Sequence, residues 1–122
     1  MAQTTQIVNE NLEPLKTAAL TSLAAASATG AGTSQYWGAV KASHALQVIL
    51  GGTAPATTVN VNLEGSLDGV HWTVIGSWSL AGGQTSGETV WFTGKAAIFT
   101  RANLTSMSGG TAPTCTAIIG AA

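Results

Sequence analysis

Charged side chains are scarce in this chain of 122 residues: Asp, Glu, Lys and Arg make up 7% of it, against roughly 25% in an average globular domain. There is no basic stripe for a phosphate backbone and no polybasic patch for anionic lipid, so we expect neither nucleic-acid binding nor membrane association. So little charge suits a subunit that is largely covered by neighbours. A monomer kept soluble by its Thr, Ser, Asn and Gly residues is the alternative that the composition leaves open.

Cysteine occurs once, at Cys115, which excludes an internal disulfide and a cysteine-based zinc site. No run approaches the roughly 18 apolar residues of a membrane span, and the first ten residues lack the basic and apolar regions of a signal peptide. We therefore expect synthesis in the cytoplasm and no membrane anchor.

Residue sets for catalysis are also missing. His44 and His71 have no third partner at metal-ligand spacing, and there is no Gly-x-Ser-x-Gly motif. Glu64 and Asp68 flank a turn and could hold a cation or a sugar hydroxyl, but Asp68-Gly69 is more simply a turn-forming pair. We expect no catalytic, cofactor-binding or metal-binding residues, and hence not an enzyme.

The sequence does contain a repeat. Gly-Gly-Thr-Ala-Pro occurs at Gly51 to Pro55 and again at Gly109 to Pro113. Glycine permits a positive φ and proline removes a hydrogen-bond donor, so each copy favours a chain reversal. Both copies are predicted to be hairpin connections between the strand-like runs that flank them, namely His44 to Leu50 and Thr57 to Leu63, then Ile98 to Leu104 and Thr114 to Ile119.

Apolar and polar residues alternate from about residue 36 onward, which is typical of strands. Val59, Val61 and Leu63 give the cleanest pattern, and the Gly65 to Gly69 turn joins this run to the next one as a hairpin. Residues 81–87 are predicted to be a loop, and 88–93 and 97–104 to be two strands separated by Gly94-Lys95. The core is expected to contain Leu46, Val48, Leu50, Val59, Val61, Leu63, Trp72 and Val74.

Six or seven short antiparallel strands in about ninety residues predict an all-β fold, an antiparallel β-sandwich or jelly roll. Residues 21–122 are assigned to this domain and residues 1–20 to an extended N-terminal arm, because few large apolar residues precede Leu20. Asn11 could cap a short helix in the arm, and residues 20–31 are ambiguous between the end of that helix and a strand.

Candidate interface residues are apolar side chains that have no obvious place in the core. In the arm, an extended segment could order against a partner. Two tryptophans cannot be assigned to a face and would be surface anchors if they project outward. The set comprises Ile7, Val8, Leu12, Leu15, Trp78 and Trp91.

Two segments resemble hairpins of small structural proteins of tailed bacteriophages. One is VNLEGSLDGVHW, from Val61 to Trp72, and the other is RANLTSMSGGTAPT, from Arg101 to Thr114. In those proteins the two hairpins lie in a β-sandwich that sits on the virion. The resemblance spans about Leu20 to Ile119 and does not cover the arm.

This resemblance implies a virion protein made in the host cytoplasm. A lone domain with an arm is most similar to capsid decoration proteins, which implies the phage major capsid protein as partner, a location on the capsid surface and a homotrimer at three-fold positions. A module of a tail or fibre protein is an alternative. From the residues alone, a carbohydrate-binding module that stacks Trp78 or Trp91 on a sugar ring also stays open.

Overall fold

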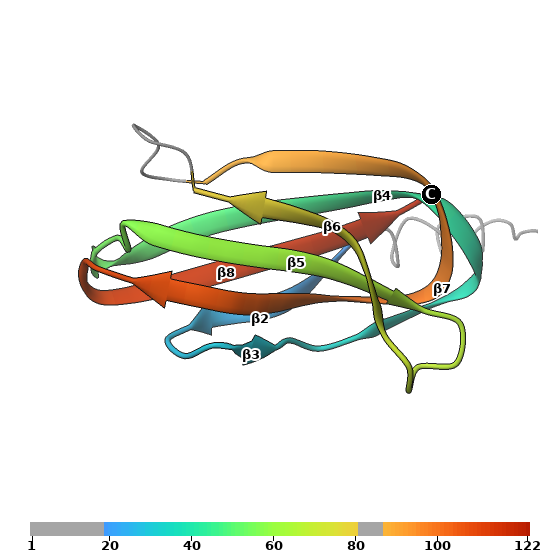
Figure 1. Ribbon diagram of the computed structural model, residues 1–122, viewed down its shortest axis with the longest axis horizontal. Coiled ribbons are helices and arrows are strands. Elements are labelled where there is room, and N and C mark those ends of the chain that lie inside the picture. Colours follow the sequence, from blue (N-terminus) through green and yellow to red (C-terminus); the bar gives the residue numbers. More distant parts are fainter. Residues whose placement is uncertain (1–18, 81–86) are drawn as a thin grey trace, which may run out of the picture.

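The computed structural model describes residues 19–80 and 87–122 (Figure 1). These residues form strands and connections, with no helix among them. The predicted all-β class is therefore confirmed. The strands are β2 (Ala19–Ala26), β3 (Gly30–Ala31), β4 (Gln35–Ala54), β5 (Thr58–Ser66), β6 (Thr73–Ser79), β7 (Thr89–Ser108) and β8 (Thr111–Ala121).

All strand pairs are antiparallel, in the order β2-β8-β4-β7-β5-β6 with β3 added on β7. The sheet folds over itself into two layers because β4 and β7, with 20 residues each, bend from one layer to the other. The first layer, here the β8 layer, contains β2, β8, the second half of β4 and the first half of β7. The second, the β5 layer, contains β3, the second half of β7, β5 and β6 (Figure 1).

The bend in β7 lies at Gly94, which has a φ of 83° and open space where a Cβ would stand. The register with β4 shifts on either side of Lys41, so both strands turn at the same level. Two separate strands at 88–93 and 97–104 were predicted, and this is wrong. A single glycine bends the strand, while pairing continues with β4 before it and with β5 after it.

The two Gly-Gly-Thr-Ala-Pro segments are not hairpin turns, in contrast to the prediction. β4 lies in the β8 layer and β5 in the other, so the first copy crosses between layers, and the second crosses back from β7 to β8. The copies pair with each other, Gly52 with Pro113 and Ala54 with Thr111. Alternation on both sides of each copy directs apolar side chains to one shared core, and facing strands satisfy that pattern as well as paired ones do.

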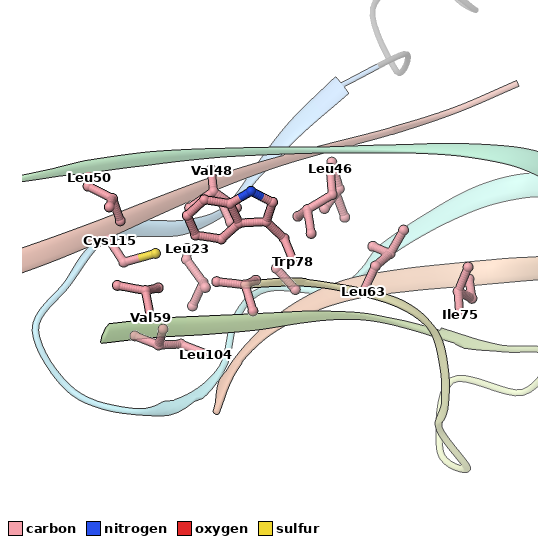
Figure 2. Close-up of a cluster of buried hydrophobic side chains, with 14 of the residues drawn as sticks. Leu23, Leu46, Val48, Leu50, Val59, Leu63, Ile75, Trp78, Leu104 and Cys115 are labelled. Carbon is pink, nitrogen blue, oxygen red and sulfur yellow. The ribbon is translucent and has the colours of Figure 1, made fainter. Parts of the chain in front are cut away.

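The core lies between the layers (Figure 2). Leu46, Val48 and Leu50 of β4 point toward the β5 layer, which contributes Val59, Val61 and Leu63, and all six are buried as predicted. β8 adds Cys115, Ala117 and Ile119. Burial raises the pKa of the Cys115 thiol to about 11, so this cysteine is an unreactive core residue.

The predicted burial of Trp72 and Val74 is wrong. Val74 is 43% exposed, and Trp72 is only half-buried on the outer side of the β5 layer. The register shows why: Leu63 pairs with Gly76 and Glu64 with Val74, so Ile75 is an extra residue in β6. This bulge places Ile75 in the core and reverses the facing of the residues before it.

The N-terminal part of the described chain is a strand, which settles the ambiguity over residues 20–31. β2 pairs with β8, and Leu23 is buried. Ser22 Oγ donates to the carbonyl of Thr33 and accepts from the backbone N–H of Ala102, at 2.7 and 2.9 Å. The predicted arm helix lies outside the described residues, so the boundary at residue 20 stays a prediction; β2 begins one residue before it.

Candidate interaction faces

The two outer faces of the sandwich differ in chemistry. On the β8 layer, one row of paired residues runs from Trp91 of β7 through Ala45 of β4 and Gly120 of β8 to Ala19 of β2. Trp91 is 72% exposed, and its neighbours in this row are small. A depression of about 400 Å³ lies beside the indole, with Ser43 and Thr93 among its polar lining residues.

The neighbouring rows on this layer add Gln47, Ile49, Thr89, Thr116 and Ile118, and Ile49 is 43% exposed. We call the outward side chains of the described β8 layer the Trp91 face; none of them is Asp, Glu, Lys or Arg. Its members are Ala19, Thr21, Ser43, Ala45, Gln47, Ile49, Thr89, Trp91, Thr93, Thr116, Ile118 and Gly120.

The outer face of the β5 layer, here called the polar face, carries amide and hydroxyl side chains that bond across the strands, beside the half-buried Trp72 and the exposed Val74. Ser77 Oγ donates to Asn62 Oδ1 at 2.7 Å, and Ser79 Oγ donates to Asn60 Oδ1. Cross-strand pairs of this kind stabilise a sheet and leave its surface well hydrated. The polar face therefore suits contact with solvent.

One charged cluster completes the polar face. Glu64, which is only 8% exposed, accepts from Arg101 Nε at 2.7 Å and from Asn103 Nδ2 at 2.9 Å. The Arg101 guanidinium lies 4.2 Å from the centre of the Trp72 ring, a cation–π contact. Both Glu64 oxygens are engaged within the sheet, so the cluster is organised to hold β5, β7 and the β5–β6 loop together.

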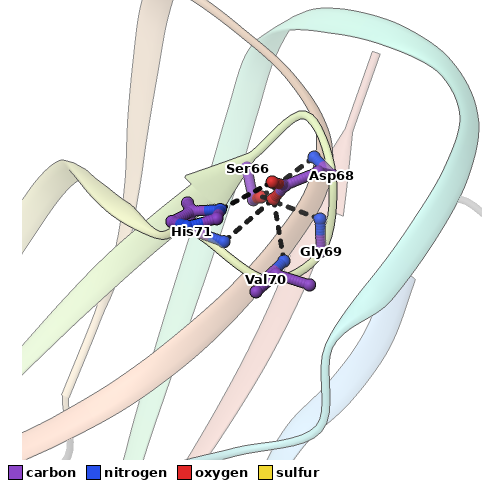
Figure 3. Close-up of polar contacts among 5 residues, drawn as sticks. All are labelled: Ser66, Asp68, Gly69, Val70 and His71. Carbon is purple, nitrogen blue, oxygen red and sulfur yellow. Dashed lines mark hydrogen bonds and ion pairs between the residues drawn. The ribbon is translucent and has the colours of Figure 1, made fainter.

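Asp68 organises the loop between β5 and β6 (Figure 3). Its Oδ1 accepts from Ser66 Oγ and from the backbone N–H groups of Val70 and His71, at 2.8 to 2.9 Å. Its Oδ2 accepts from His71 Nδ1 at 2.7 Å. The hydrogen bonds from His71, followed by those from Val70 and Ser66, hold the pKa of Asp68 well below its usual range. The interpretation of Asp68-Gly69 as a turn-forming pair is confirmed.

The histidines have separate environments. His71 is exposed on the loop, whereas His44 is 2% exposed and its Nε2–H donates to the carbonyl of Lys95 at 2.8 Å. His44 Nδ1 is buried and has no hydrogen-bond partner. Across residues 19–80 and 87–122, no three His, Cys, Asp or Glu side chains are grouped as metal ligands would be.

Among the candidate interface residues, the structure separates the two tryptophans. Trp78 is 3% exposed and its Nε1–H donates to Glu88 Oε1 at 2.8 Å, so it is a core residue and not a surface anchor (Figure 2). Trp91 projects outward, as a surface anchor would. Ile7, Val8, Leu12 and Leu15 lie outside the described residues.

Two features of the outer faces were missed by sequence reasoning. The Trp72–Arg101 contact depends on the bulge at Ile75, which has no distinctive residue pattern. The sequence does contain two uncharged stretches, 42–63 and 102–122, that contribute to the Trp91 face. Only the strand pairing shows that these stretches lie side by side.

Comparisons with known proteins give a likeness of fold. No family model and no curated protein matches the chain. YomS, a protein derived from the SPBc2 prophage, is similar in structure with a TM-score of 0.55 at 12% identity, over 83% of this chain and 89% of that one. The C-terminal domain of a chitobiase from Bacteroides fragilis gives a TM-score of 0.48 at 16% identity, over 68% of this chain and 56% of that one, which is too distant to carry an argument. The β-sandwich fold thus occurs in a phage-derived protein.

Proposed function

We propose that this protein is a non-enzymatic structural protein of a bacteriophage virion, which binds the lattice of the major capsid protein on the capsid surface as a symmetric homotrimer. The observation that carries the proposal is the uncharged Trp91 face with its exposed indole, on a domain whose other face carries cross-strand polar hydrogen bonds and the Glu64–Arg101 ion pair. Large exposed apolar groups on an otherwise polar domain mark interaction sites. The Trp91 face is the surface that neighbouring molecules cover in the assembly.

The fold and the motifs support the same proposal. YomS, which has the same architecture, is a prophage-derived protein. The Val61 to Trp72 and Arg101 to Thr114 segments resemble those of phage virion proteins. Closed symmetry repeats one small interface, and weak contacts to a lattice of equivalent sites add up through multivalency.

Two measurements test the proposal. Light scattering on the purified chain is expected to give the mass of a trimer. Co-sedimentation with capsids assembled without the protein is expected to carry the chain into the capsid pellet, in a fixed ratio to the coat subunit. A chain that stays monomeric and remains in the supernatant would contradict the proposal; binding to tails alone would favour a tail or fibre module.

A carbohydrate-binding module is the second candidate, favoured by the depression beside Trp91 with its Ser43 and Thr93 hydroxyls. Sugar rings stack on exposed indoles, and hydroxyl side chains can bond their edges. Retention of the chain on an insoluble polysaccharide, lost in Trp91→Ala and kept in Trp72→Ala, would support this candidate over the virion proposal.

A further inference from the structure

The row Trp91–Ala45–Gly120–Ala19 forms a shelf on the Trp91 face. The indole stands at one end, and the three residues beside it have either no side chain beyond Cβ or no side chain at all. An extended peptide can therefore lie close to the sheet and pack an apolar side chain against the flank of the indole.

The size of the face limits what can cover it. Four strands about 4.8 Å apart and about eight residues long at 3.3 Å each give ~19 Å by ~26 Å, or ~500 Å². A single extended segment fits within this footprint.

The segment that precedes Ala19 has the chemistry for this site. Residues 1–9 contain no charged side chain and include the apolar pair Ile7 and Val8. Glu10, Glu13 and Lys16 all lie between that pair and β2. An uncharged segment can be placed on the uncharged face without burying an ionised side chain.

We propose that residues 1–9 of a neighbouring copy lie on the Trp91 face, with Ile7 and Val8 packed against Trp91; this rests on the self-association in the proposed function. Ala19, the first residue of β2, pairs with Gly120, one residue before β8 ends, and Trp91 lies in that same row. To cover its own face the chain would have to reverse at once. A neighbour's segment needs no reversal, and the 18 residues before Ala19 can span up to about 60 Å.

A disulfide trap tests the contact directly. Ile7→Cys and Gln47→Cys are prepared as two separate single variants, mixed in equal amounts and oxidised; Gln47 is exposed and lies one row from Trp91. A disulfide between these two variants forms only between copies. The native Cys115 is fully buried and does not compete. The matched control replaces Gln47→Cys with Ser77→Cys, an exposed position on the polar face.

The expected result is a cross-linked species of twice the chain mass from Ile7→Cys with Gln47→Cys, at least tenfold more abundant than with Ser77→Cys. A chain that carries both Ile7→Cys and Gln47→Cys tests whether the segment instead covers the face of its own copy. If this chain cross-links only within one chain, the segment covers its own face and the proposal is wrong. Equal cross-linking to both faces, or none to either, also overturns it.

Light scattering separates this proposal from the proposed function. Removal of residues 1–18 and the substitution Trp91→Ala are each expected to weaken self-association at least tenfold, whereas Trp72→Ala leaves it unchanged. An oligomer that persists in both altered chains overturns the arm contact and leaves the virion role intact. Loss of self-association in Trp91→Ala but not in the truncated chain identifies another occupant, such as a second sheet face, and overturns the proposal as well.

Discussion

At the scale of single residues, the four tryptophans show how the same side chain serves different purposes. Trp37 and Trp78 are buried, and each donates its indole N–H at 2.8 Å, to Thr100 and Glu88 respectively. Trp72 covers an arginine on the polar face, and Trp91 is exposed. Two of the four indoles thus contribute apolar area to the core, and one leaves it on the surface.

Trp78 and Trp91 give a matched pair of substitutions. Trp78→Ala is expected to lower the free energy of unfolding by about 3 to 5 kcal/mol, because it removes a buried aromatic ring and leaves a cavity. Trp91→Ala should stay within about 0.5 kcal/mol, as is usual for a surface position. Urea denaturation at a protein concentration low enough to keep the chain monomeric measures both, and a large loss in Trp91→Ala under that condition would mean that the indole is buried within its own chain.

Asp68→Asn tests the loop between β5 and β6. The folded-state pKa of Asp68 lies below the ordinary value of 3.8, so the carboxylate stabilises the fold at pH values above 3.8, and this stabilisation is lost as the pH falls below it. Thermal melts between pH 7 and about pH 2 are expected to show Asp68→Asn melting below the parent at neutral pH, with the gap closing in acid. Added salt should narrow the gap, since the carboxylate is exposed. A gap that is independent of pH would mean that Asp68 does not act through its charge.

At the scale of elements, the sequence was most informative where a strand is regular. Period-two alternation in β5 and in the second half of β4 correctly predicted six core residues, and the hairpin between β5 and β6 was also found. It failed where one residue changes the geometry: Ile75 inserts a bulge, and Gly94 bends β7 without ending it. Alternation shows which side of a strand is buried, but it does not show which strand lies beside it. The two Gly-Gly-Thr-Ala-Pro crossings were therefore predicted to be hairpins.

The close contact between the two crossings can be tested by substitution of glycine. A Cβ at Gly52 would stand 2.2 Å from the carbonyl oxygen of Ala112, whereas a Cβ at Gly94 would meet nothing within 4 Å. Both glycines have positive φ, so alanine at either position costs roughly 1 to 2 kcal/mol in backbone strain. Gly52→Ala should cost a further 1 to 3 kcal/mol or so from overpacking between the paired repeats. Equal losses in denaturant titrations would show that the two segments do not meet closely.

At the scale of the whole molecule, the distribution of side chains separates a hydrated face from one that is suited to contact. On the polar face, polar side chains form hydrogen bonds between β5, β6 and β7, and Glu64 forms an ion pair with Arg101. The Trp91 face has no charge among its described residues. Such a difference in charge between the two outer faces is expected of a subunit that faces neighbours on one side and water on the other.

Cryo-electron microscopy of capsids assembled with and without the protein tests the proposed role most directly. The account predicts additional density on the capsid surface at three-fold positions, present only in particles that contain the protein, with the polar face turned to solvent and the Trp91 face covered by a neighbouring copy. Capsid shells without added density, density confined to the tail, or single copies with an uncovered Trp91 face would contradict it.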